Sequence, residues 1–323
     1  MKKKLLAIAL SAIGAVGAVQ AGAVAQSSLE ITNLVLRNGT GGAILDAGQF
    51  GLLQINDATN LNPTVTPGGA TPFVNSTSGG APLPLTVVCF PVACPAALTA
   101  PGPFGNATTP ATVNGALAAS SADGAPISGL FIPGTPPTAI PVGVNARTNA
   151  VAERTTSGSA NTTSALSVAV QFAFRPTADV AINISFNALD HLLAFLDTQT
   201  NAIAGSGWNV NILDHGTGAT VFDWTPNGSL AAGGITGGVE VADPCSLTRS
   251  ITAFGPSANA TYNCSGAFSA TSNLLLAGVT YDASITHSNQ ANVILRVPEP
   301  SMLSLLGLAL VGVGFTTRRK SKA

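Results

Sequence analysis

Few side chains in this 323-residue sequence are suited to catalysis or metal binding. The three histidines are His191, His215 and His287, and two of them directly follow an aspartate, as Asp190-His191 and Asp214-His215. Adjacent residues of a strand point to opposite faces, so neither pair is expected to act as an acid–base dyad. His215 is better explained as a hairpin-turn residue. The sequence therefore predicts no catalytic residue among the histidines.

Four acidic residues fall in or near predicted turns and are the next candidates: Asp214, Asp223, Glu240 and Asp243. Loop carboxylates of this kind can bind Ca²⁺, which prefers oxygen ligands. No D-x-[DN]-x-[DN]-G calcium loop is present, and no G-x-S-x-G, H-E-x-x-H, P-loop or G-x-G-x-x-G motif occurs. We therefore interpret these carboxylates as solvated turn residues and expect neither a metal nor a cofactor.

Two tryptophans, Trp208 and Trp224, flank one predicted hairpin. If they were exposed on a flat face, they could stack on sugar rings. The apolar residues that alternate with polar ones after Trp208 instead favour packing in a core.

The four cysteines are Cys89, Cys94, Cys245 and Cys264, and their local spacing pairs the first two and the last two. A zinc site is the alternative. However, a C-x4-C pair and a pair 19 residues apart, with no clustered histidine, match no common zinc spacing. An even number of cysteines at short spacing in an exported chain is typical of disulfides. We therefore predict the disulfides Cys89–Cys94 and Cys245–Cys264.

The elements that would position these residues are predicted from apolar periodicity. Alternating apolar residues over 166–174 and 180–186 indicate two strands, joined by a short polar turn into an antiparallel hairpin. Residues 188–196 fit either a helical turn or an edge strand. Further strands are predicted at 29–38, 51–56, 208–212, 219–224, 246–254, 260–276, 281–287 and 292–297.

Short strands separated by Gly-rich turns, with almost no helical periodicity, predict a mainly β fold, an antiparallel β-sandwich. The segment Leu275–Tyr281 is similar to a corner found in many sandwich domains. There a tyrosine near the start of a strand bonds back to the connecting backbone. Core packing of Tyr281 is the alternative.

One part of the chain differs in its proline content. Fifteen of the 21 prolines fall between residues 63 and 141, and no apolar periodicity survives there. Because proline is rarely tolerated in central strands, residues 61–145 are predicted to be an irregular Pro/Gly-rich insertion, either a flexible linker or a long ordered insertion. Only residues 85–90 fit a short edge strand. Residues 26–60 are then N-terminal strands of the β domain, and 146–296 the main sandwich.

The N-terminus has the form of a secretory signal peptide, with a short basic stretch before the apolar run Leu5–Val19. Ala23-Val24-Ala25 fits an A-x-A cleavage site, which makes residues 1–25 the signal peptide. Val19-Gln20-Ala21 is a second candidate site.

The C-terminal segment 297–323 consists of three parts. It begins with Val297-Pro298-Glu299-Pro300-Ser301, continues with the 14 uncharged residues Met302–Phe315, and ends in a basic stretch that contains Arg318, Arg319 and Lys320. The prolines end the preceding fold and leave an extended segment. A helix of the central part would span about 21 Å, less than the ~30 Å hydrocarbon core of a bilayer. We therefore predict a short apolar helix that holds the protein in the membrane for a limited time, with the basic stretch on the cytoplasmic side.

This tail closely resembles the sorting signal of PEP-CTERM proteins, which are processed by exosortase, a membrane transpeptidase-like protease. The resemblance covers about 27 of the 323 residues, and all three parts occur in order at the C-terminus. It implies export across the inner membrane of a Gram-negative bacterium, cleavage near Pro298-Glu299-Pro300, and release to the cell surface or its polysaccharide matrix. An ordinary tail anchor is the alternative interpretation.

The charge of the chain limits its partners. All five lysines lie in the two terminal segments, so residues 26–297 contain six basic and 13 acidic residues, a net charge of about −7. Nucleic acids and anionic lipid head groups both attract basic surfaces, so neither is expected to bind the mature chain.

Three functions are compatible with these features. The first is a non-enzymatic protein of the cell surface or extracellular matrix, with an exosortase-type protease as processing partner and the exopolysaccharide of a biofilm as candidate ligand. The second is a carbohydrate-binding module in the same matrix, which exposed aromatic residues on one sheet would support. The third is a secreted hydrolase, which would need a cleft with two carboxylates ~5–10 Å apart. The sequence favours the first.

Overall fold

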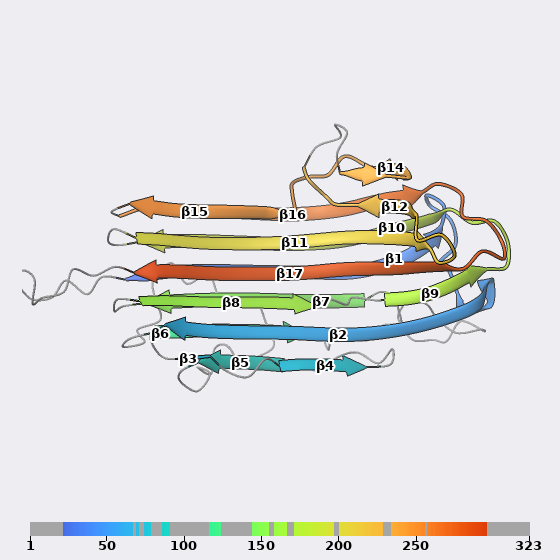
Figure 1. The fold of residues 1–323 in the computed structure, drawn as a ribbon. Coiled ribbons are helices and arrows are strands. Elements are labelled where there is room, and N and C mark those ends of the chain that lie inside the picture. Colours follow the sequence, from blue (N-terminus) through green and yellow to red (C-terminus); the bar gives the residue numbers. More distant parts are fainter. Residues whose placement is uncertain are drawn as a thin grey trace, which may run out of the picture.

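The computed structural model shows two antiparallel β-sheets stacked face to face, which confirms the predicted β-sandwich (Figure 1). The strands run antiparallel to their neighbours in both sheets. The structure describes residues 22–66, 69–70, 74–78, 86–90, 116–123, 144–154, 158–166, 171–196, 200–228, 234–255 and 257–295.

The first sheet, sheet A, has seven described strands. Their spatial order is β14 (Gly238–Glu240), β16 (Asn259–Ser272), β10 (Ile182–Leu196), β1 (Ala23–Asn38), β7 (Val144–Arg154), β6 (Ala116–Asp123) and β5 (Thr86–Phe90).

The second sheet, sheet B, has ten described strands. Its main path is β13 (Ile235–Thr236), β12 (Thr220–Trp224), β11 (Thr200–Asp214), β17 (Tyr281–Leu295), β8 (Gly158–Leu166), β2 (Phe50–Thr66) and β3 (Gly69–Ala70). Beside this path, β15 pairs with β11, β4 pairs with β2, and β9 pairs with both β17 and β2; their bounds are Arg249–Gly255, Val74–Ser78 and Gln171–Pro176. A 3₁₀ turn, η1 (Ala47–Gln49), precedes β2.

Alternation along the strands produces the interior of the sandwich. In β10, for example, Ile184 and Phe186 are buried, whereas Asn187 and Leu189 are exposed. One end of the interior is an aromatic core, which includes Phe172, Phe174, Phe186, Trp208, Phe222, Trp224, Phe268 and Tyr281. The other end, where β1 begins and β17 ends, is an alanine core that includes Ala23, Ala25, Ala150, Ala152, Ala194, Ala202, Ala204 and Ala291.

The predicted hairpin between residues 166–174 and 180–186 was wrong. β9 pairs with β17 and β2 in sheet B, whereas β10 lies in sheet A between β1 and β16. Residues 177–181 between them therefore carry the chain from one sheet to the other. Two strands with alternating apolar residues can each bury one face in the same sheet or in two facing sheets. Periodicity alone therefore could not show whether these two strands pair with each other.

Two other strands are longer and more central than expected. Residues 188–196, which fitted a helical turn or an edge strand, belong to β10 and pair on both sides. The predicted strands 281–287 and 292–297 form one continuous strand, β17, which ends at Leu295. The expected break at Ser288–Ala291 is absent because these polar residues continue the ladder with β11 and β8.

The proline-rich region 61–145 contains more regular structure than the sequence indicated. β5 matches the predicted edge strand at 85–90 and is the last described strand of sheet A. β6 was not predicted, because its sequence Ala-Leu-Ala-Ala-Ser-Ser-Ala-Asp has little apolar contrast. The region also supplies β3 and β4, and its other residues after Thr66 lie largely outside the described part of the chain.

The N-terminal strand occupies the middle of sheet A. β1 begins at Ala23, so Ala23-Val24-Ala25, which the sequence placed in the signal peptide, pair with β7 and β10 in this structure. Residues 1–21 lie outside the described part of the chain. The predicted N-terminal strands of residues 26–60 correspond to most of β1 and to the first part of β2.

The two sheets are also linked at one edge, where the chain passes from β13 in sheet B to β14 in sheet A. Gly237 makes this crossing with a positive φ of 70°. A Cβ atom there would lie 1.9 Å from the carbonyl oxygen of Val221, so only glycine fits.

The tyrosine corner expected at Leu275–Tyr281 is present. The Tyr281 hydroxyl accepts a hydrogen bond of 2.9 Å from the backbone N–H of Leu276, five residues upstream. The Tyr281 ring is buried and packs 5.5 Å from the ring of Phe174. The residue thus fixes the loop before β17 and contributes to the aromatic core.

We predict that Tyr281→Phe lowers the free energy of unfolding by about 1 kcal/mol, because it removes one buried hydrogen bond and keeps the ring. Urea denaturation of the exported chain measures this change. Thr286→Val, an exposed change further along β17, is the control and should alter stability little. A Tyr281→Phe protein as stable as wild type would show that the corner hydrogen bond does not contribute.

Candidate functional site

The sorting segment predicted from the sequence begins directly after the folded part of the chain. β17 ends at Leu295, whose partners are Thr200 on β11 and Gly158 on β8. The motif at 297–301 and the basic residues 318–320 lie outside the described part of the chain. The motif is therefore joined to a strand that is paired along both edges.

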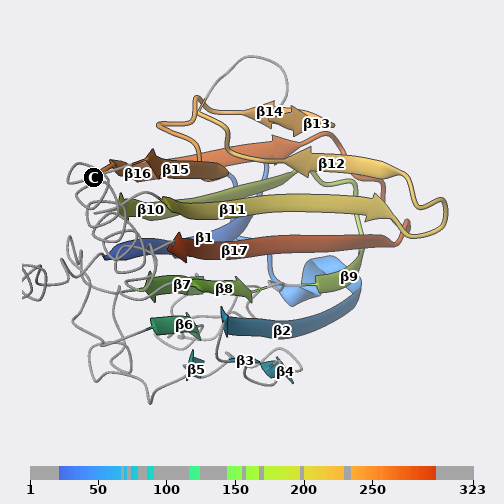
Figure 2. The ribbon, with the colours of Figure 1, turned by 60° about the vertical axis from the view of Figure 1, so that its left-hand side comes forward.

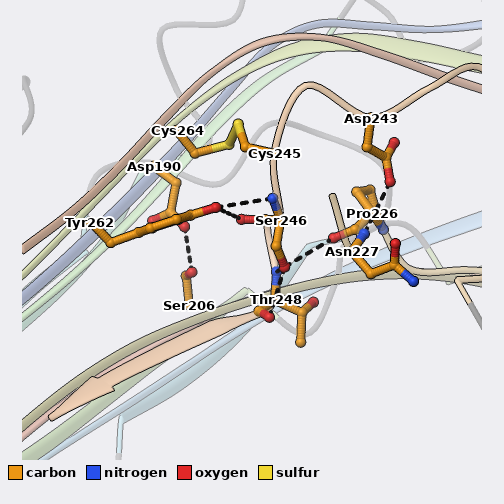
Figure 3. The surroundings of a disulfide bond; sticks show 10 residues. All are labelled: Asp190, Ser206, Pro226, Asn227, Asp243, Cys245, Ser246, Thr248, Tyr262 and Cys264. Atoms are coloured by element: carbon orange, nitrogen blue, oxygen red, sulfur yellow. Dashed lines mark hydrogen bonds between the residues drawn. A yellow bond between two sulfur atoms is a disulfide. The ribbon is translucent and has the colours of Figure 1, made fainter. Parts of the chain in front are cut away.

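The predicted disulfide Cys245–Cys264 is present, with Cα atoms 5.8 Å apart (Figure 3). Cys264 lies on β16, and Cys245 lies in the segment between β14 and β15. Beside the disulfide, the Tyr262 hydroxyl accepts a hydrogen bond from the N–H of Ser246 (3.0 Å) and donates one to its carbonyl oxygen (2.8 Å). One covalent bond and two hydrogen bonds thus fix this segment to sheet A.

We predict that the double variant Cys245→Ser/Cys264→Ser loses about 3 kcal/mol of unfolding free energy, the loop-closure value for a separation of 19 residues. Denaturant unfolding under oxidising conditions tests this. A reducing agent acts on the predicted Cys89–Cys94 disulfide in both proteins, so it should remove only the difference in stability between the wild-type sandwich and the variant. Equal stability of the two proteins before reduction would argue against a stabilising disulfide.

The other predicted disulfide remains a prediction. Cys89 belongs to β5, but Cys94 lies outside the described part of the chain.

An interior polar layer lies between the aromatic and alanine cores. The Ser27 hydroxyl on β1 donates a hydrogen bond of 2.7 Å to the carbonyl oxygen of Gly205 on β11. The Asn289 amide on β17 contacts the hydroxyls of Ser27 and Thr148. Ser27 and Thr148 belong to sheet A, and Gly205 and Asn289 belong to sheet B. These contacts therefore join the two sheets through the interior.

Asp190 on β10 extends this layer and is completely buried. The Ser206 hydroxyl on β11 donates a hydrogen bond of 2.5 Å to Asp190 Oδ2 (Figure 3). Within the described structure, Asp190 Oδ1 is buried without a hydrogen-bond partner. Burial raises the pKa of Asp190 to about 7, although the hydrogen bond from Ser206 acts in the opposite direction.

His287 on β17 is the second buried ionisable group near this layer and is 3% exposed. Burial lowers the pKa of His287 to about 3, while the backbone of Leu29 raises it by less. The imidazole is therefore neutral at physiological pH. Folding weakens the binding of a proton to His287, whereas it strengthens the binding of a proton to Asp190.

These two residues predict opposing pH dependences of stability. The folded state binds the Asp190 proton more tightly than the unfolded state, so this term of the unfolding free energy falls as pH rises from about 4 to about 7. The folded state binds the His287 proton less tightly, so the second term rises as pH rises from about 3 to about 6.5. Between pH 4.5 and 6 the two slopes, each up to ~1.4 kcal/mol per pH unit, should largely cancel.

We predict that Asp190→Asn makes stability rise with pH across this interval relative to wild type, and that His287→Gln makes it fall. Denaturant unfolding at closely spaced pH values measures both slopes. The difference from wild type removes the contribution of other groups such as Asp243, whose pKa is raised to about 6 by burial and by Glu240. Variant curves parallel to the wild-type curve would contradict the assignment.

The aspartate–histidine pairs form no dyad in the structure. Asp190 points into the sandwich, whereas the His191 ring contacts Asn263 on the outer side of sheet A. His215 lies in the turn after β11, where its Nδ1 is 2.7 Å from Asp282 Oδ2 on the surface. This confirms the turn position of His215.

The four carboxylates that the sequence placed in or near turns accept hydrogen bonds from the backbone and from neighbouring side chains. Asp214 accepts hydrogen bonds from two N–H groups of its own turn. The Trp224 indole donates to Glu240, and the Asn227 N–H donates to Asp243. Asp223 accepts from the amides of neighbouring asparagines on β11. In the described residues no three His, Cys, Asp or Glu side chains are grouped to hold a metal ion.

Both tryptophans pack in the core, as the sequence favoured. Trp208 is 2% exposed and Trp224 is 0% exposed. Their rings lie 5.1 Å apart in an edge-to-face arrangement, and Phe186 packs against both. Neither indole is available to stack on a sugar ring.

Sequence reasoning missed the interior polar layer. Ser27 and Asn289 lie in stretches rich in polar residues, where no periodicity distinguishes an inward serine from an outward one. Asp190 was considered only as a partner of His191. Its position in the alternation of Ile182, Ile184 and Phe186 was the available signal that it faces inward.

Comparison with known proteins identifies the tail of the chain. No curated protein matches the chain significantly. None of the described helices is long and apolar enough to cross a membrane. Residues 296–320 match the PEP-CTERM protein-sorting motif, as the sequence analysis expected. This motif implies export and membrane-anchored sorting in a Gram-negative bacterium. The chain thus carries a PEP-CTERM sorting signal, which supports processing by an exosortase.

Proposed function

We propose that this protein is a non-enzymatic component of the cell surface or extracellular matrix, released from the inner membrane by cleavage near Pro298-Glu299-Pro300. The observation that carries the proposal is the sorting motif at 296–320, which starts immediately after β17 ends at Leu295. A proline-flanked segment can extend neither the strand nor a helix, so it offers a protease an extended backbone. Cleavage there leaves every described strand intact.

The positions of the ionisable groups support a non-enzymatic role. Asp190 and His287 are enclosed between the sheets and are not accessible to a substrate. His215 is exposed, but it pairs with Asp282 beside a surface turn. A hydrolase would need two accessible carboxylates facing one cleft.

The outer face of sheet B supports association with a neutral exopolysaccharide. Its central strands, β11 and β17, present mostly uncharged polar residues outward, which can exchange hydrogen bonds with sugar hydroxyls. They include Asn201, Asn209, Asn211, Ser284, Thr286, Ser288, Gln290 and Asn292. The carbohydrate-binding module that was the second candidate relied on exposed aromatic rings, and the burial of Trp208 and Trp224 weakens it.

We predict that replacing Pro298 and Pro300 with Ala, or Glu299 with Ala, leaves full-length protein in the inner membrane. Glu30→Ala, which removes the same charge from the sandwich, should be processed normally. Neutral residues in place of Arg318, Arg319 and Lys320 should impair retention and therefore processing. Cell fractionation with mass spectrometry of the mature C-terminus measures each outcome. Surface protein that still ends at Ala323 would refute exosortase sorting and support an ordinary tail anchor.

A further inference from the structure

Both ends of the described chain leave the sandwich at the same place. Ala23, at the start of β1, pairs with Leu196 and Arg154 at the ends of β10 and β7. Leu295, at the end of β17, pairs with Thr200 at the start of β11, which follows the end of β10 by four residues in the sequence. Figures 1 and 2 both place the start of β1 and the end of β17 at one end of the strands. We call this the exit end.

The exit end is held close to any membrane that contains the tail. Six residues, 296–301, separate Leu295 from the uncharged run that begins at Met302. Fully extended, this connection reaches no more than about 25 Å. The strands of the sandwich are much longer, since the 15 residues of β17 span about 50 Å. The tether therefore keeps the exit end within about 25 Å of the bilayer, whereas the opposite end lies a strand length further along the molecule.

Charge is distributed unequally between the two ends. Among the described residues of the outermost strand positions at the exit end, the charged side chains are Glu153 and Arg154, and both are buried. In the sequence, one acidic and one basic residue directly follow β10 and β17, Asp197 and Arg296. Solvent-accessible carboxylates gather instead at the opposite end, including Asp46, Asp179, Asp214 and Asp282. The net negative charge of the exported chain is thus remote from the exit end.

Two apolar side chains are exposed on the outer face of sheet B beside the exit end. Phe254 on β15 is 80% exposed, and Ile294 on β17 is 39% exposed. Both pair with Asn201 on β11, so they lie in one row across three neighbouring strands, one position before the strand ends. An exposed phenylalanine in a soluble environment is unfavourable, whereas aromatic and aliphatic side chains are stable at the bilayer interface.

We propose that, while the sorting tail is attached, the exit end rests on the outer surface of the inner membrane, with Phe254 and Ile294 in the interfacial region of the bilayer. The proposal rests on the proposed sorting function, because the tail supplies the tether. Exposed apolar residues also occur at the opposite end, among them Val239 at 68% exposure. These residues lie close to carboxylates such as Glu240, about the length of the strands from the tether.

Site-specific photo-crosslinking tests this contact. The photoreactive amino acid p-benzoylphenylalanine replaces Phe254 in one protein and Val239, at the opposite end, in a matched control. Each chain, from Gly22 to Ala323, is reconstituted in vesicles of phosphatidylethanolamine and phosphatidylglycerol. Resistance to carbonate extraction first reports whether the tail is inserted. Illumination should then give at least tenfold more phospholipid adduct at position 254 than at 239.

The outcomes separate this proposal from the sorting function. An inserted protein with no adduct at 254, or with equal adducts at both positions, would overturn the end-on contact and leave sorting intact. A protein that carbonate removes would contradict the membrane anchoring on which both proposals depend. If position 254 crosslinks to an exosortase in native membranes but never to lipid in vesicles, the partner of this surface is the protease instead of the bilayer.

Discussion

The hydrogen bonds of the interior polar layer determine how the two sheets lie on each other. Apolar contacts have no direction, and rows of alanine offer little shape that could fix one alignment over its neighbour. The contact of Ser27 with Gly205, and those of Asn289 with Ser27 and Thr148, are directional and buried. A shift between the sheets would leave these polar groups without partners, at a cost of roughly 1–3 kcal/mol each. Only one alignment of the two sheets therefore gives all of these buried polar groups their hydrogen-bond partners.

The cores on either side of this layer contribute unequally to stability. Each large aromatic side chain buries about 150–250 Å², which at ~25 cal/mol per Å² corresponds to several kcal/mol. An alanine removes much less apolar area from water. The end that holds Trp208, Trp224 and Phe186 therefore provides most of the hydrophobic stabilisation. The exit end depends more on its backbone ladders, which pair β1 and β17 on both edges.

The sequence was a good guide to strands and a weaker guide to their arrangement. Alternation identified β10 and β11, and the tyrosine corner and the Cys245–Cys264 disulfide followed from local spacing. Alternation could not show that β9 and β10 lie in different sheets, because it records only which face is buried. It also missed β6, whose alanines and serines differ too little in polarity. The sorting signal was recognised because its residues are contiguous in the sequence, whereas the polar layer brings together residues from five strands, β1, β7, β10, β11 and β17.

The attachment of the tail to a central strand has a mechanical consequence. A surface protein bound to a matrix while its tail remains in the membrane experiences force, and this force enters the fold at Leu295. It acts along the axis of β17, whose ladders with β11 and β8 must then slide as a whole. An edge strand pulled from its end would instead release its hydrogen bonds one pair at a time. The fold therefore resists such a load in shear, through both ladders of β17 at once.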